Sequence, residues 1–138
     1  MTQTEIDAKD LAESDIICFG EEGMSAEEWL KALTENSIVV REVKDGVTAG
    51  IAVAKWDAGI GYLYSNAVLP EYRRQGIAAR LTQQRVACLN RLGCTKIQAH
   101  TRVGNVASQT VLDNAGFRVV QYVPDFYDEF KDGILWER

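Results

Sequence analysis

The sequence is poor in several residue types, and each scarcity excludes a class of protein. It has one histidine and three cysteines in 138 residues, and the spacing of Cys18, Cys88 and Cys94 matches no metal-binding pattern. We therefore expect no metal and reduced, buried thiols in a cytoplasmic location. The longest apolar run, Ala49 to Ala54, is too short to cross a membrane, and the first residues lack the basic and apolar regions of a signal peptide.

Positive charge is also scarce. Lysine and arginine total 15 against 20 acidic residues, which gives a net charge of −5 and a pI near 4.9. A nucleic-acid partner is not expected, because binding one requires a basic face. The acidity favours a cationic ligand such as an amine, although it can equally serve solubility alone. A hydrophobic content of 46% is ordinary for a globular protein, and the length predicts one domain, 1–138.

The order of predicted elements indicates an α+β fold. In the first half, hydrophobic periodicity and turn residues predict helices over about 7–19 and from a capping box at 25–28, followed by strands over 38–43, 47–56 and 61–68. In the second half they predict a helix after Gly76, a strand over 96–101 and a helix capped by Asn105. The chain then continues as a strand over 117–123, a loop over 124–132 and a strand over 134–136. A helix between two strands implies a right-handed crossover, so the strands containing Val68 and Ile97 should be parallel. The remaining sheet is mostly antiparallel.

One charged residue interrupts the apolar face of the helix after Gly76. That face contains Ile77, Leu81 and Leu89 at helical spacing, and Arg85 falls among them. We expect the stem of Arg85 to be packed and its guanidinium to lie in water.

The turn between Val68 and that helix has the composition of an anion site. It contains Arg73, Arg74, Gln75 and Gly76, and a helix start offers unpaired N–H groups at the positive end of a dipole. Gly76 lets the backbone approach a bulky ligand. The alternative is an ordinary strand-to-helix turn that happens to be basic.

Two motifs carry a family resemblance. The spacing Arg73-x-x-Gly76-x-Ala78 resembles the Arg/Gln-x-x-Gly-x-Gly/Ala signature of the GNAT superfamily of N-acetyltransferases, whose loop holds the pyrophosphate of acetyl-CoA. The segment 105–108, followed by Gly-Phe at 116–117, resembles the second signature, in which the asparagine and its helix face CoA. The resemblance covers most of the chain from 38 to 136 and implies a GNAT-like fold. Over the first third it is weaker, so the first strand of the family is expected to be short or absent.

The resemblance implies acetyl-CoA as cosubstrate and a set of binding residues. These are Val68, Arg73, Arg74, Gln75, Gly76, Ala78, Asn105 and Ser108. In the family a strand bulge offers the N–H that stabilises the thioester oxyanion, and the match puts this donor near 67–69. The family often has a tyrosine seven residues after the asparagine as general acid, but this chain has Leu112 there.

Catalytic candidates are therefore sought elsewhere. His100 lies five residues before Asn105, where related N-terminal acetyltransferases have a catalytic glutamate, and it could act as base; a satisfied histidine at a strand end is the alternative. Tyr127 is the substitute acid, or else part of an aromatic clamp. Acceptor binding would fall to the carboxylates Asp125, Asp128, Glu129 and Asp132, with Glu21 and Glu22 as a second candidate wall. The alternative is that these carboxylates are merely solvated.

The resemblance implies acetyl transfer to a primary amine, on either a small molecule or a peptide, by direct attack in a ternary complex. A degenerate domain that binds CoA thioesters without turnover is the alternative, favoured by the absence of tyrosine at Leu112. A different nucleotide-binding function is disfavoured because no Gly-x-x-x-x-Gly-Lys-Ser/Thr segment exists. Pairing of the last strands between subunits is common in the family, so a homodimer is one expectation.

Overall fold

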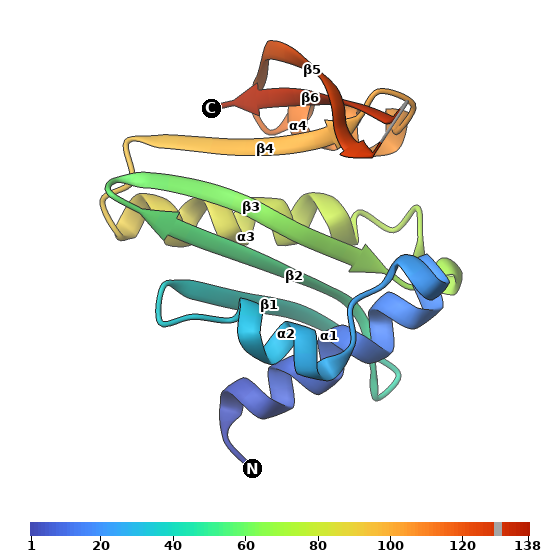
Figure 1. Ribbon diagram of the computed structural model, residues 1–138. Helices are drawn as coiled ribbons and strands as arrows, with labels where there is room; N and C mark the ends of the chain where they lie inside the picture. The colour runs from blue at the N-terminus through green and yellow to red at the C-terminus, as the bar shows by residue number, and fades with distance from the viewer. Residues whose placement is uncertain (129–130) are drawn as a thin grey trace.

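The computed structural model describes residues 1–128 and 131–138, which form a mixed sheet with helices on both faces (Figure 1). The six strands lie in the order β1-β2-β3-β4-β6-β5. Their bounds are β1 Ser37–Lys44, β2 Val47–Asp57, β3 Ile60–Val68, β4 Lys96–Arg102, β5 Arg118–Asp128 and β6 Lys131–Glu137. Only β3 and β4 are parallel, and every other neighbouring pair is antiparallel. The predicted α+β fold and the parallel pair are confirmed.

The helices divide between the two faces of the sheet. Their bounds are α1 Gln3–Phe19, η1 Gly20–Glu22, α2 Ala26–Ala32, η2 Pro70–Tyr72, α3 Ile77–Arg91 and α4 Val106–Asn114. Side chains alternate along β2: Ile51 and Val53 pack with residues of α1 and α2, whereas Ala52 packs with residues of α3. None of the helices in the described part of the chain is long and apolar enough to cross a membrane.

The first third of the chain is helical and contributes no strand before β1. Thr2 caps α1: its side chain accepts from the Glu5 N–H, and the Glu5 carboxylate accepts from the Thr2 N–H. This capping box starts the helix at Gln3, several residues earlier than predicted. The strand with which the family usually begins is thus absent from the described residues, which is one of the two outcomes expected from the sequence.

The hairpins that join β1 to β2 and β2 to β3 use left-handed turns. Asp45 and Gly46 have φ of 53° and 74° between β1 and β2, which suits a type I′ turn and matches the predicted turn. Ala58 and Gly59 have φ of 49° and 80° between β2 and β3. Such turns follow the right-handed twist of the strands and fix the register of this half of the sheet.

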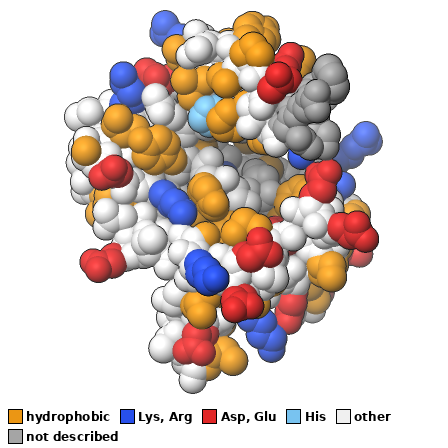
Figure 2. Space-filling view, in the orientation of Figure 1, with side chains coloured by type: hydrophobic (Ala, Val, Ile, Leu, Met, Phe, Trp, Pro, Cys, Tyr) orange, Lys and Arg blue, Asp and Glu red, His pale blue; other side chains and the backbone are white. Residues whose placement is uncertain are grey.

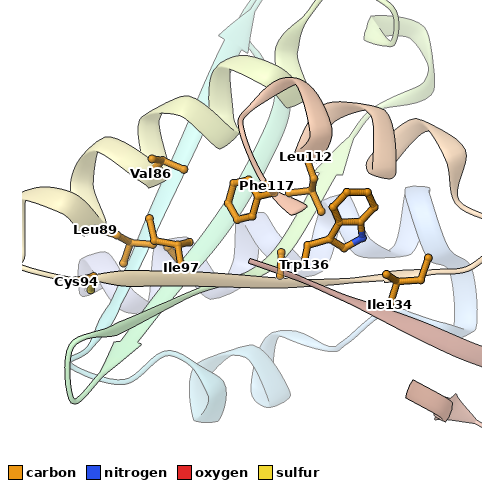
Figure 3. Packing of buried hydrophobic residues seen from close by; sticks show 10 residues of the cluster. Val86, Leu89, Cys94, Ile97, Leu112, Phe117, Ile134 and Trp136 are labelled. Carbon is orange, nitrogen blue, oxygen red and sulfur yellow. The ribbon is translucent and has the colours of Figure 1, made fainter. Parts of the chain in front are cut away.

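Close packing holds α3 against the sheet. A side chain at Gly50 would come within 2.5 Å of Ile77, and one at Gly61 within 2.7 Å of Leu89. Further along, α3, α4 and the strands enclose a second apolar cluster, drawn in Figure 3, which includes Val86, Leu89, Ile97, Leu112, Phe117, Ile134 and Trp136. Because α3 cannot retreat without opening these contacts, its first turn is fixed relative to β2 and β3.

Two further expectations about the fold were wrong. The described residues of the stretch 124–132 do not form a loop, since β5 runs to Asp128 and β6 begins at Lys131. Asp125 with φ of 54°, together with a register shift between Val123 and Asp128, breaks the regular pattern there, which explains why the sequence looked like a loop. The head of Arg85 does not lie in water: the residue is only 2% exposed, and backbone carbonyls satisfy its guanidinium.

Candidate functional site

The site begins where the two parallel strands separate. Ile60–Leu63 pairs with Lys96–Ala99, and beyond these residues β4 pairs only with β6. In Figure 1 the strands β3 and β4 diverge from this point. A cleft of about 650 Å³ opens between them, above the start of α3 and beside α4. Figure 2 shows this face of the molecule hollowed near its centre, with the chain's one histidine, in pale blue, at the edge.

A bulge directs the backbone of β3 into the cleft. Val53 pairs with Ser65 and Ala54 with Leu63, so Tyr64 is the extra residue. Beyond the bulge the ladder is regular, and the Leu69 N–H donates to Ala49 O at 2.9 Å. Hydrogen-bonded and non-bonded pairs alternate in such a ladder.

By this alternation the N–H groups of Asn66 and Val68 point away from β2, toward the side from which β4 has departed. The predicted donor region is therefore directed into the cleft, but the bulge itself lies upstream of 67–69, at Tyr64. Asn66 is a second cleft-facing amide, which the sequence did not identify. The direction of the Asn66 N–H follows only from the register of β3 against β2.

The turn before α3 presents a row of unused amides. Arg74 and Gly76 have φ of 64° and 79°, and Gly76 is the N-cap of the helix. The first helical bond is from the Arg80 N–H to Gly76 O at 3.0 Å. Among the described residues, no backbone acceptor takes the N–H groups of 74–79. These amides and the helix dipole form an anion site of the kind that holds phosphate groups.

A clamp orients this turn. The Arg80 guanidinium donates to both carboxylate oxygens of Glu42 on β1, at 2.8 and 2.7 Å, and to Gln75 O at 3.0 Å. Its hydrogen bonds lower the pKa of the Glu42 carboxyl. The clamp thus ties the Gln75 carbonyl of this turn to α3 and β1, while the N–H groups of 74–79 have no backbone acceptor among the described residues.

Most of the predicted binding residues line the cleft. They are Val68, Arg73, Arg74, Gly76, Ala78, Asn105 and Ser108, together with His100. Gln75 is not among the lining residues. Two of the side chains are partly engaged: Arg73 Nε donates to Val68 O at 3.0 Å, and the Asn105 side-chain oxygen accepts from the Ser108 N–H at 3.1 Å, which caps α4.

An aromatic stack lies at the mouth of the cleft. The rings of His100 and Phe126 are parallel, with centroids 4.1 Å apart, and Tyr127 meets Phe126 edge-on at 4.8 Å. Partial burial lowers the pKa of His100 below its usual 6.5, so the imidazole is neutral at pH 7 and able to accept a proton. Tyr127 does not line the cleft, burial raises its pKa, and its ring packs under Arg102.

The acidic candidates that the structure describes do not line the cleft. None of the described residues that line it is an aspartate or a glutamate. Glu22 pairs with Arg102 at 3.2 Å, and an Asp132 oxygen accepts from the Asp125 N–H at 3.0 Å. The side chains of Asp128 and Glu129 lie outside the part of the chain that the structure describes.

Leu112, at the position of the family's tyrosine, is buried with Phe117 and Trp136.

Residues 1–128 and 131–138 contain no group of three or more metal-binding side chains. Of the cysteines, Cys94 is buried, as expected, but Cys18 and Cys88 are only partly so.

Comparisons with known proteins agree on one family. A model of the "Acetyltransferase (GNAT) family" matches residues 7–117. The chain is 33% identical over 75 residues to N-alpha-acetyltransferase 30 of Schizosaccharomyces pombe, covering 51% of this chain and 50% of that protein. It is 31% identical over 101 residues to an uncharacterized N-acetyltransferase of Methanocaldococcus jannaschii, covering 72% of this chain and 64% of that protein. The matched regions thus span from half to just under two thirds of these relatives.

Solved structures share the fold. The ribosomal-protein-S18-alanine N-acetyltransferase from Escherichia coli superposes with a TM-score of 0.86 at 18% identity, covering 99% of this chain and 88% of that chain. An aminoglycoside 6'-N-acetyltransferase complexed with coenzyme A gives a TM-score of 0.81 at 18% identity, covering 95% and 89%. At 18% identity this likeness establishes the fold alone, so the substrate has to be inferred from the residues of the site.

Proposed function

The chain belongs to the GNAT acetyltransferase family, and we propose that it transfers an acetyl group from acetyl-CoA to a primary amine. One observation carries this proposal: two sets of backbone amides, at 74–79 and at Asn66 and Val68, have no protein acceptor among the described residues, and all of these residues except Gln75 line one cleft. The first set suits a diphosphate, and the second suits a carbonyl oxygen or an amide-containing chain. The positive charges of Arg73 and Arg74 complement the diphosphate.

The proposed chemistry needs a base and an oxyanion donor. Acetyl-CoA supplies an activated acyl group and a thiolate leaving group. His100 lines the cleft with a lowered pKa and accepts a proton from the substrate ammonium, directly or through water, which leaves the neutral amine to attack the thioester carbonyl. The Asn66 N–H donates to the carbonyl oxygen as it becomes negatively charged, which is where a fixed donor accelerates acyl transfer.

The acceptor is proposed by class. The names of N-alpha-acetyltransferase 30 and of the ribosomal-protein-S18-alanine N-acetyltransferase support a peptide α-amine, whereas the aminoglycoside enzyme supports a small amine. We favour the peptide, because the aromatic wall of His100, Phe126 and Tyr127 offers an apolar surface beside the cleft on which a first side chain can pack.

The test is an amine panel incubated with acetyl-CoA while free thiol is followed. The panel contains peptides with different first residues, their N-terminally blocked copies, polyamines and aminoglycosides. Amine-dependent thiol release, with the acetylated product identified by mass, supports the proposal. Tight binding of acetyl-CoA without release to any amine contradicts it.

That second outcome would favour a CoA-thioester-binding module without turnover. Two observations support this alternative: the buried Leu112 in place of a tyrosine, and the lack of a carboxylate among the described residues of the cleft wall. The amine panel separates the two functions, because both require binding but only the enzyme releases thiol in proportion to amine.

A further inference from the structure

Arg85 is buried between α3 and the sheet, and none of the described carboxylates is its counter-ion. It projects from α3, is 2% exposed, and pairs with no carboxylate among the described residues. Burial lowers its pKa to about 10, so it still carries its charge at pH 7. Holding an unpaired cation in the interior is costly, and an apolar side chain would fill this helix position more cheaply.

The contacts of Arg85 converge on the β3 bulge. Its Nη1 donates to Val53 O at 3.1 Å and to Ser65 O at 3.2 Å, and these are paired residues on the two strands at the bulge. Its Nε donates to Leu81 O at 3.3 Å and its Nη2 to Thr82 Oγ1 at 3.3 Å. One end of the guanidinium is thus anchored to α3, while the other holds both strands where the ladder is irregular.

The bulge controls the amide that follows it. Ser65, held through its carbonyl, is directly bonded to Asn66, whose N–H faces the cleft. The Ser65 carbonyl and the Asn66 N–H belong to one planar trans peptide group, so a shift of the carbonyl turns the N–H with it. Because a bulge bends its strand and changes its twist, the direction of this peptide depends on how the bulge is held. Arg85 itself lines the same cleft.

We propose that Arg85 is a positioning residue, which locks the β3 bulge by bridging the carbonyls of Val53 and Ser65 and thereby aims the Asn66 N–H at the thioester carbonyl. This inference rests on the proposed function and adds to it how the oxyanion donor is held. A general structural role would affect all ligands alike. A positioning role affects only ligands that carry the carbonyl.

The experiment uses two ligands that differ in this one group. Acetyl-CoA has the thioester carbonyl, and S-ethyl-CoA has a methylene in its place. The ratio of their dissociation constants, measured by calorimetry, reports recognition of the carbonyl, while S-ethyl-CoA alone reports the anion loop. For Arg85→Met, which keeps an unbranched stem but loses the guanidinium and its hydrogen bonds, we expect the preference for acetyl-CoA to fall roughly five- to tenfold, the size of one hydrogen bond. Binding of S-ethyl-CoA should change less than twofold.

Three further variants complete the test. Arg91→Met changes an exposed arginine of the same helix and should leave the ratio unchanged. Arg85→Lys restores charge and part of the hydrogen bonding, so its ratio should be intermediate. Thr82→Val removes only the Nη2 acceptor and should lower the ratio less than Arg85→Met does. If Arg85→Met does not fold, Arg85→Lys and Thr82→Val decide the matter.

An unchanged ratio in the folded Arg85 variants overturns the inference, as does an equal loss of affinity for both ligands. A fall of the same size in Arg91→Met also overturns it, because the effect would then belong to the helix as a whole. If the wild-type protein binds neither ligand, it is the proposed function that fails.

Discussion

The imidazole of His100 lies flat on the ring of Phe126, with centroids 4.1 Å apart and planes 8° apart. The contact joins β4 to the distal part of β5, a segment in which the sequence had suggested a loop. Stacking on one face fixes the orientation of the imidazole and removes water from that face. This partial burial is also what lowers the pKa of His100.

Replacement of His100 tests its role as base. Because burial lowers the pKa of His100 below its usual 6.5, the imidazole is mostly neutral at pH 7, and the neutral form is lost as the pH falls through that pKa. The wild-type rate should therefore carry an acid limb, whereas His100→Gln should be about 100-fold slower at pH 7.5 and lack that limb. The difference between the two proteins should shrink toward low pH. Superimposable pH–rate profiles would rule out His100 as the base.

Replacement of Tyr127 tests whether its hydroxyl takes part. The ring packs against Phe126 and under Arg102, and it does not line the cleft. Tyr127→Phe should keep the ring packing, and we expect less than a threefold change in rate. A large loss of rate with an unchanged melting temperature would show that the hydroxyl reaches the reacting groups and donates a proton there.

Substitution of two glycines with similar φ, Gly76 and Gly46, distinguishes a loss of CoA binding from a general loss of stability. Gly76 and Gly46 have φ of 79° and 74°, so Gly76→Ala and Gly46→Ala should each cost roughly 1–2 kcal/mol of stability. Only Gly76 lies at the amides of the cleft. We expect Gly76→Ala to weaken CoA binding about tenfold and Gly46→Ala to leave it unchanged, measured by calorimetry beside chemical denaturation. Equal CoA affinities in the two variants would contradict the assignment of the anion site.

A buried carboxylate fixes the connection between α1 and α2. The Asp15 Oδ2 accepts from the Met24 N–H and from the Trp29 indole N–H, each at 3.0 Å, and the residue is 4% exposed. Asp15→Ala should lower the free energy of unfolding by about 2–3 kcal/mol, because both donors lose their acceptor. Asp15→Asn keeps an acceptor oxygen and should cost less than half as much in urea denaturation. A larger loss for Asn than for Ala would refute this explanation.

The sequence was informative where a function depends on the main chain. Gly76 and the order of strand, turn and helix predicted the anion loop, because unpaired amides follow from a helix start whatever the side chains are. The parallel pairing of β3 and β4 followed from the handedness of crossovers. The fold class was predictable because it follows from the order of the strands and helices along the chain.

Features that depend on register or on distant contacts were not predictable. Asn66 became a candidate donor only when the pairing of β2 with β3 showed which amides face outward. Arg85 was expected in water, and its true acceptors belong to residues up to 32 positions away in the chain. The strand through Phe126 was missed because a register shift and the positive φ of Asp125 disrupt the alternation on which strand prediction depends.

The proposed function rests on one arrangement: the backbone amides before α3 bind the diphosphate of acetyl-CoA, while its thioester lies beside β3. Its most direct test is calorimetric titration, at two temperatures, with acetyl-CoA and with S-acetyl-pantetheine, which has the same thioester but no diphosphate. We predict saturable binding of acetyl-CoA and at least about 100-fold weaker binding of S-acetyl-pantetheine, since hydrogen bonds to charged groups contribute about 1.5–3 kcal/mol each. Equal affinities for the two compounds, or no binding of acetyl-CoA, would contradict it.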